Sequence, residues 1–158
     1  MLKFEGSNGK SCEFDRESVR ASEVLEALGL QKKAIAAKLD GAAMDLNREI
    51  RAGGRVEPLT AADEEGLDVL RHSCAHLMAQ AIERLYPGTH FGIGPCIKDG
   101  FYYDVDATGT ITEQDLPAIE AEMRKLAGAA EKVEREEMRR EDALKFFKDR
   151  GDPYKEEL

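Results

Sequence analysis

Two histidines supply the clearest candidate chemistry in this sequence. His72 and His76 are four residues apart, so on an α-helix they lie on one face, one turn apart. Histidine titrates near neutral pH, transfers protons and binds metal ions. The spacing is compatible with two surface residues, with a metal-binding pair, or with two neutral imidazoles that orient a water molecule or a ribose hydroxyl. The zinc peptidase motif of the same spacing has glutamate after its first histidine, where this chain has Ser73.

The helix that carries the pair should extend from about Glu64 to Tyr86 and end before Pro87. With about 100° of rotation per residue, both histidines lie roughly 180° from the apolar positions of this helix. We therefore expect the two imidazoles to point away from the side that faces the core. Apolar residues recur at intervals of three and four on that side, at Leu67, Leu70, Cys74, Leu77, Ala81 and Leu85.

A glycine-rich segment follows the helix and predicts two β-segments joined by a turn at residues 98–100. Gly92 and Gly94 remove side chains from one strand face, which either admits a ligand or another backbone or marks a bulge or tight bend. Tyr102 and Tyr103 should point to opposite faces, so one can pack while the other presents its hydroxyl. We expect the imidazoles to face a hollow that has the Gly94 strand as one wall.

Residues 1–62 predict a small α+β unit. A strand hairpin comes first, and a helix capped by Ser22 follows it. The next strand ends in an Asp40-Gly41 turn, and a late strand carries Pro58, which suggests a position at the edge of the sheet. This order of elements is that of a β-grasp, ubiquitin-like fold, and we expect a recognition or docking module.

Residues 63–158 predict a second α+β unit that begins with the histidine helix. Thr112 opens a capping box, and the helix that follows it has apolar residues at helical spacing. The charged stretch 132–138 is interpreted as a strand. Residues 141–150 form a further amphipathic helix in this interpretation, with Phe147 on its inner side. The chain then starts a new pattern and stops, so we expect it to be part of a longer polypeptide.

Composition narrows the classes of function. The chain has 158 residues, which suits one ordinary domain or two small ones. Its net charge of −9 argues against a surface that binds the phosphate backbone of a nucleic acid by itself. Three cysteines without paired metal spacing favour a reduced, cytoplasmic setting. No apolar run approaches the ~20 residues that span a membrane, and the first residues do not form a signal peptide.

Four motifs together resemble the bacterial type of threonyl-tRNA synthetase: DEEGL at 63–67, RHSCAHL at 71–77, GIGP at 92–95 and GFYYDVD at 100–106. The resemblance covers the whole chain. It implies a TGS domain in the first part and the beginning of an editing domain in the second, with the long His-x-x-x-His helix packed on antiparallel strands. The implied function is hydrolysis of serine wrongly attached to threonine tRNA. A threonine pocket cannot strongly reject serine, because one methyl group is worth only about 1–3 kcal/mol.

The resemblance also implies roles for individual residues. His72 orients the attacking water or the terminal ribose hydroxyl, and His76 is its hydrogen-bond partner. Tyr103 lies at the editing cleft. Lys155 stabilises negative charge that develops on the ester oxygen. The amino-acid pocket is shaped by backbone groups of Gly94 and Pro95.

The family completes this site with a later Cys-x-x-x-His segment, before which the chain ends. We therefore expect the parent protein to be a threonine–tRNA ligase and this chain alone to be inactive. No metal is expected here, because the ATP, magnesium and zinc of the family are bound through residues that this chain lacks. The implied partners are the acceptor end of tRNA(Thr) carrying serine and the rest of the synthetase, which dimerises through absent domains in the cytoplasm, without a membrane.

Two other hypotheses remain. One is a free-standing deacylase related to the alanyl-tRNA editing proteins, which share the His-x-x-x-His helix and often bind zinc. The other is a non-catalytic module that contains a TGS domain and binds RNA or protein.

Overall fold

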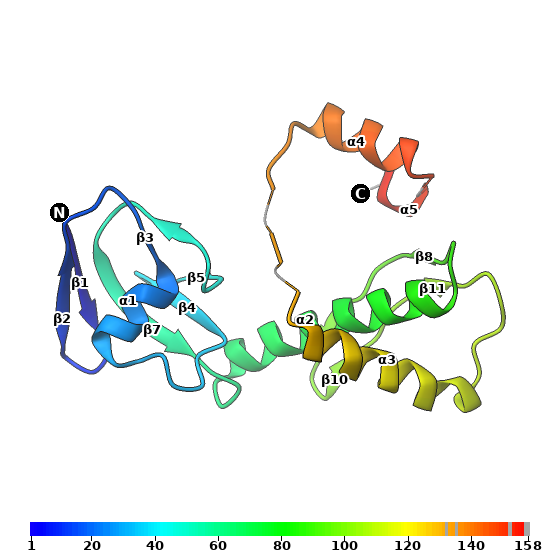
Figure 1. The fold of residues 1–158 in the computed structure, drawn as a ribbon, viewed down its shortest axis with the longest axis horizontal. Coiled ribbons are helices and arrows are strands. Elements are labelled where there is room, and N and C mark those ends of the chain that lie inside the picture. Colours follow the sequence, from blue (N-terminus) through cyan, green and yellow to red (C-terminus); the bar gives the residue numbers. More distant parts are fainter. Residues whose placement is uncertain (132, 135, 152, 157–158) are drawn as a thin grey trace. The chain divides into compact units, whose positions relative to one another are not determined.

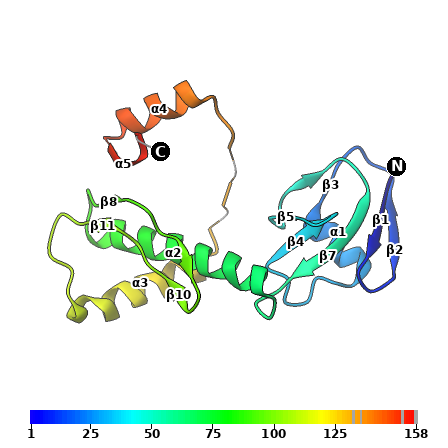
Figure 2. The ribbon, with the colours of Figure 1, turned by 180° about the vertical axis from the view of Figure 1, so that it is seen from behind.

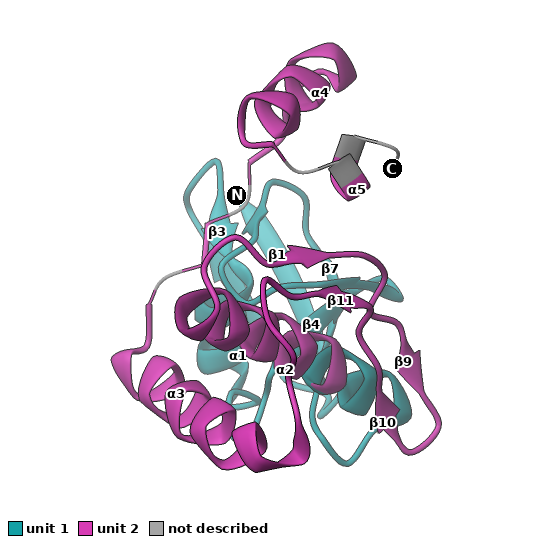
Figure 3. Cartoon of the chain, turned by 90° about the vertical axis from the view of Figure 1, so that its right-hand side faces the viewer, with its two compact units in different colours: residues 1–70 teal, residues 71–158 magenta. Residues whose placement is uncertain are grey.

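The chain folds as a mixed α+β protein, as predicted (Figure 1, with the opposite view in Figure 2). It divides into two compact units, unit 1 (residues 1–70) and unit 2 (residues 71–158), as Figure 3 shows. The division falls within one helix, and the domain boundary expected between residues 62 and 63 stays a prediction. The structure is a computed structural model, and it describes residues 1–131, 133–134, 136–151 and 153–156.

Unit 1 is built on a five-stranded sheet. The strands of the unit, two of which lie outside this sheet, are β1 (Leu2–Gly6), β2 (Ser11–Phe14), β3 (Val19–Arg20), β4 (Ala36–Leu39), β5 (Ala42–Met44), β6 (Glu49–Ile50) and β7 (Gly54–Leu59). The sheet has the order β2-β1-β7-β4-β5, in which β1 and β7 are parallel and the other neighbours antiparallel. Strands β3 and β6 form a separate antiparallel pair. The predicted first hairpin, of β1 and β2, is confirmed.

Helix α1 (Ala21–Leu28) covers the core of unit 1 with Val24, Leu25 and Leu28, which are buried together with Phe4 of β1. The predicted cap at Ser22 was wrong. The helix begins at Ala21 and its cap is Arg20, two residues before Ser22, and the carboxylate of Glu23 accepts a hydrogen bond from the backbone N–H of Arg20 at 3.0 Å. A carboxylate three residues inside a helix reaches back to the first free N–H in the same way in a capping box.

Pro58 does not lie on an edge strand, so that prediction was also wrong. Strand β7 lies between β1 and β4 in the sheet. However, its alignment with β1 covers only Gly54–Val56, and Pro58 lies beyond that stretch, opposite Ala37 of β4. The missing amide hydrogen of the proline therefore interrupts no bond between β7 and β1.

Helix α2 (Glu64–Leu85) begins with a tight local structure. The carboxylate of Asp63 accepts hydrogen bonds from the backbone N–H and the hydroxyl of Thr60, both at 2.8 Å. A Cβ placed on Gly66 would lie 1.9 Å from the carbonyl oxygen of Thr60. Glycine is therefore required in the first turn of this helix, because the preceding loop folds back against the helix backbone.

Unit 2 combines the rest of α2 with a hairpin and further helices. They are β8 (His90–Phe91), β9 (Cys96–Ile97), β10 (Gly100–Phe101), β11 (Val105–Asp106), α3 (Leu116–Ala129), α4 (Arg140–Asp149) and α5 (Pro153–Glu156). Strand β9 pairs with β10 and β8 with β11, both antiparallel, so the four strands are two arms of one hairpin. The predicted pair of β-segments is confirmed, with each arm divided into two short strands.

The core of unit 2 lies between α2, α3 and the hairpin. Its members are Ala79, Ala81, Ile82, Phe91, Ile119 and Leu126. The predicted apolar side of α2 was partly wrong, because Leu70 and Leu85 are 44% and 40% exposed. The buried residues of this part of the helix are mainly alanines. Small side chains let neighbouring segments approach the helix backbone closely. The tertiary contacts therefore determine that the alanine side of α2 is the buried side.

The capping box before α3 is confirmed. Asp115 accepts hydrogen bonds from the backbone N–H of Thr112 at 2.7 Å and from its hydroxyl at 2.8 Å. The strand expected over residues 132–138 is not found in the described part of that stretch, which is neither helix nor strand, while Lys132 and Arg135 lie outside the described residues. Within the described chain, no helix has the length and apolar character needed to cross a membrane.

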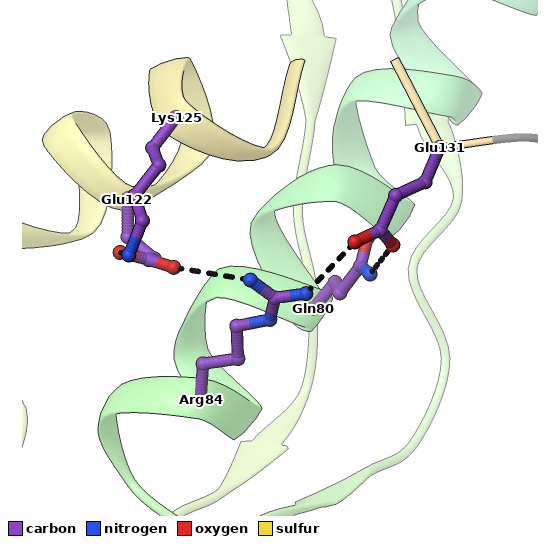
Figure 4. Close-up of polar contacts among 5 residues, drawn as sticks. All are labelled: Gln80, Arg84, Glu122, Lys125 and Glu131. Carbon is purple, nitrogen blue, oxygen red and sulfur yellow. Dashed lines mark hydrogen bonds and ion pairs between the residues drawn. The ribbon is translucent and has the colours of Figure 1, made fainter. Parts of the chain in front are cut away.

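A polar network joins the end of α3 to α2 (Figure 4). The guanidinium of Arg84 contacts Glu122 of α3 at 3.5 Å and Glu131, just beyond α3, at 3.2 Å. Gln80 donates to the same Glu131 at 3.4 Å, and Lys125 pairs with Glu122. The network therefore connects α2 both to α3 and to Glu131, just beyond the end of α3.

Candidate functional site

The two histidines of α2 form a direct pair. Their Nε2 atoms are 3.0 Å apart and their ring centroids 4.5 Å apart, with the planes at 81°. Both side chains are exposed, as expected for residues on one face of the helix outside the core. In this contact one ring must donate and the other accept. The pair therefore carries at most one positive charge while the bond is formed.

Contrary to the prediction, the two imidazoles do not point directly away from the buried side of α2. The buried residues of this part of α2 are Ala75, Ala79, Ala81 and Ile82. At about 100° per residue, His72 and His76 lie roughly 75° and 115° from the centre of that buried side, not 180°. The imidazoles therefore flank the core, and residues of the hairpin that enter the core can reach them.

Tyr103 is the hairpin residue that does so. Its ring centroid lies 6.4 Å from that of His76 at an interplanar angle of 76°, and 5.5 Å from that of Phe91 at 77°. Both contacts have the edge-to-face geometry that aromatic rings prefer. Phe91 is buried in the core of unit 2 and Tyr103 packs against that core. Tyr103 thus connects the core to the exposed imidazole pair.

Gly94 makes room for Tyr103. A Cβ on Gly94 would lie 2.6 Å from two carbons of the Tyr103 ring. The sequence suggested that glycine here admits a ligand or backbone, or marks a bulge; the close neighbour is instead a side chain of the same hairpin. The expected hollow is filled at this point by the tyrosine ring. The adjacent Pro95 is partly buried, and its carbonyl accepts the backbone N–H of Tyr102 at 3.4 Å.

The surroundings of His76 favour its neutral form. Partial burial lowers the pKa of His76 below its ordinary value, and the nearby His72 and the positive charge of Lys155 lower this pKa further. Lys155 belongs to α5, where its Nζ lies 5.8 Å from the ring centroid of Phe147. The structure thus brings four of the residues singled out in the sequence into one neighbourhood: His72, His76, Tyr103 and Lys155.

Sequence reasoning did not assign a role to Tyr154, the neighbour of Lys155. Its hydroxyl donates to Asp106 at 3.3 Å, and its ring centroid lies 6.4 Å from that of His90. Asp106 and His90 are opposite each other in the β8–β11 pair. The only sequence signal was the position of this tyrosine directly before the candidate lysine.

A metal-binding interpretation would need ligands in addition to the two imidazoles. Structural and catalytic zinc sites in proteins use three or four protein ligands. Over the part of the chain that the structure describes, no group of three or more histidine, cysteine, aspartate or glutamate residues is arranged to hold a metal ion. The described surroundings offer the two imidazole nitrogens an aromatic ring and a lysine charge as neighbours.

Comparison with known proteins identifies the family. No protein-family model matches the chain. It is 49% identical to threonine–tRNA ligase 1 of Bacillus subtilis (strain 168), over 100% of this chain and 25% of that protein. Identity is 43% to the threonine–tRNA ligase of Staphylococcus saprophyticus (100% and 24% covered) and 46% to that of Methylococcus capsulatus (96% and 24%). The chain spans about a quarter of the length of these relatives. The chain therefore belongs to the threonine–tRNA ligase family.

Proposed function

We propose that unit 2 contributes to a hydrolytic editing site for seryl-tRNA(Thr) within a threonine–tRNA ligase. The observation that carries this proposal is the imidazole pair, in which two rings share a hydrogen bond outside the core and His76 is kept neutral. A ligase that selects threonine cannot strongly reject serine, since the two differ by one methyl group worth about 1–3 kcal/mol. Hydrolysis of the smaller product at a second site is the general solution.

The hydrogen bond within the pair gives the two rings different hydrogen-bonding roles. When both rings are neutral, the ring that donates through Nε2 has a free lone pair on Nδ1, and the ring that accepts at Nε2 carries its hydrogen on Nδ1. The pair then offers one acceptor and one donor nitrogen to its surroundings. This combination suits an ester hydrolase that must orient a water molecule and a ribose hydroxyl. We assign the orienting role to His72 and the supporting role to His76.

The other proposed residues act on the ester itself. The positive charge of Lys155, which already acts on His76, would stabilise the negative charge that develops on the carbonyl oxygen during attack by water. Tyr103 would form a wall of the cleft beside His76. Backbone groups at Gly94 and Pro95 would shape the amino-acid pocket, next to the ring that Gly94 accommodates.

We further propose that unit 1 is a TGS domain of the β-grasp type. The order of its sheet, with parallel β1 and β7 in contact and one helix over the core, supports this assignment. The proposed substrate is the acceptor end of tRNA(Thr) carrying serine. Threonine charging, with its ATP, magnesium and zinc, and dimer formation would use other parts of the ligase, which we place in the cytoplasm.

The test uses a complete threonine–tRNA ligase that contains this segment, with His72→Ala. We expect threonine charging to stay intact while seryl-tRNA(Thr) accumulates. Glu83→Ala is the matched control, because Glu83 lies three turns further along the same face of α2 and is exposed. Unchanged clearance of serine in the His72 variant would refute the role of the pair. Loss of hydrolysis on zinc removal, with zinc bound at the pair, would instead favour a deacylase of the alanyl type.

A further inference from the structure

We propose that Tyr154 is a positioning residue for Lys155, and that His90 and Asp106 at the paired ends of β8 and β11 are its docking site. The inference rests on the proposed editing function, because it concerns how the lysine of that site is held. The contacts that support it are the hydrogen bond from the Tyr154 hydroxyl to Asp106 at 3.3 Å and the ring contact with His90 at 6.4 Å.

Helix α5 needs such a contact because it is a single turn of four residues. A turn of this length is not stable by itself in water. Lys155 packs over Phe147 of α4, so α4 and α5 support each other. That packing orients the lysine within the pair of helices, but it does not determine where the lysine lies relative to the imidazoles. The contacts of Tyr154 supply this second constraint, since they join α5 to the hairpin.

The docking site on β8 and β11 is connected to the imidazole pair of α2 through aromatic contacts of the hairpin. His90 precedes Phe91 in β8, and the ring of Phe91 packs against Tyr103 at 5.5 Å. Tyr103 in turn lies beside His76. A continuous series of contacts therefore leads from Tyr154 through the hairpin to His76. Lys155, which follows Tyr154 directly, is placed in register with the pair by this series.

The chemistry of the dock is specific. A tyrosine hydroxyl that donates to a carboxylate makes a charge-assisted bond, which is stronger than a bond between neutral groups. Asp106 and His90 are opposite each other across the two strands, so one tyrosine can contact both. Phenylalanine at position 154 would keep the ring contact with His90 and lose the bond to Asp106. This substitution therefore separates the contribution of Asp106 to the docking site from that of His90.

The experiment measures the titration of His76 by NMR in the whole 158-residue chain. The chain has three histidines, so single glutamine variants assign their signals. Lys155→Gln should raise the pKa of His76, because the lysine charge lowers it. We expect Tyr154→Phe to raise the pKa of His76 in the same direction as Lys155→Gln, and by no more than that change does. Tyr154→Phe should add nothing in the Lys155→Gln background, since both changes act on His76 through the lysine charge.

Two controls distinguish positioning from a general effect. Tyr102→Phe removes a hydroxyl from a tyrosine of the same hairpin that is 51% exposed, and should leave the pKa of His76 unchanged. Asp106→Asn keeps an acceptor oxygen and should retain most of the effect of Lys155. An equal shift in the Tyr102 variant would overturn the proposal. So would an unchanged His76 titration in Tyr154→Phe or in Lys155→Gln.

These results do not depend on hydrolysis. The titration reports only where Lys155 lies relative to His76, whereas the editing function is tested by serine clearance in the His72→Ala ligase. A failed titration test with lost serine clearance would reject the dock and keep the function. A successful titration test with unchanged clearance would keep the dock and reject the function.

Discussion

Replacing Gly94 with alanine should move the Tyr103 ring away from His76. The added Cβ would lie 2.6 Å from two ring carbons and 2.9 Å from a third, whereas carbon atoms in contact are normally about 3.5–4.0 Å apart. The ring must therefore retreat by about 1 Å. Overpacking of this kind costs about 1–3 kcal/mol, and a weakened edge contact with Phe91 costs about 0.5–1.5 kcal/mol. The two costs together predict that unit 2 loses about 1.5–4.5 kcal/mol.

The chain itself supplies a probe for this measurement. It has no tryptophan, and its four tyrosines are all in unit 2, so tyrosine fluorescence during urea unfolding reports on that unit alone. With a slope of about 2 kcal/mol per molar urea, the middle of the usual range, the midpoint should fall by about 1–2 M. Gly109→Ala is the matched control, because a Cβ there meets no atom within 4 Å. Equal midpoints for the two alanine variants would refute the packing argument.

The remaining predictions concern local features. Gly128→Ala should stabilise α3 by about 0.5–1 kcal/mol in thermal unfolding. Gly66→Ala should instead destabilise the protein, because the Cβ of the alanine would lie 1.9 Å from a backbone oxygen. A stabilising Gly66→Ala would contradict this. Because the pKa of His76 is lowered in the folded protein, His76 binds a proton more tightly in the unfolded chain than in the folded one. The free energy of unfolding of unit 2 should therefore fall as the pH drops below about 6.5, and His76→Gln should reduce that slope in urea titrations at several pH values. Asp115→Ala should cost about 1 kcal/mol at neutral pH through loss of the cap. Because hydrogen bonds from Thr112 lower the pKa of Asp115, the difference from the wild type should disappear in acid, and a difference that persists there would exclude the carboxylate as its source.

Several features could be predicted because they depend on residues close together in the sequence. Residues four apart share a helix face whatever surrounds the helix, which placed His72 and His76 together. The end of α1 at Gly29, with φ of +72°, and the capping box of Thr112 involve a few neighbouring residues. The two arms of the hairpin in unit 2 follow from its turn at residues 98–100.

Other features needed partners that are distant in the sequence. The side of α2 that is buried was decided by the hairpin and α3, which pack on its alanines, and not by its own leucines. Gly94 is required by the ring of Tyr103, which lies in the opposite arm of the hairpin. Gly66 is required by the returning backbone at Thr60. In each case spacing shows that a residue is small or apolar, but only the tertiary structure shows its neighbour.

The candidate site also has features that follow from neighbouring residues in the sequence and features that depend on distant ones. The types and spacing of His72 and His76 were enough to place two imidazoles on one helix face, because both are properties of one helix, but they left a surface pair, a metal-binding pair and a water-orienting pair open. The neutral state of His76 could not be predicted in this way, since it results from partial burial and from the charge of Lys155 on another helix. The hydrogen bond from Tyr154 to Asp106, which we propose positions that lysine, joins residues 48 positions apart. Electrostatic effects act over distances in space, and only folding determines which charges become neighbours.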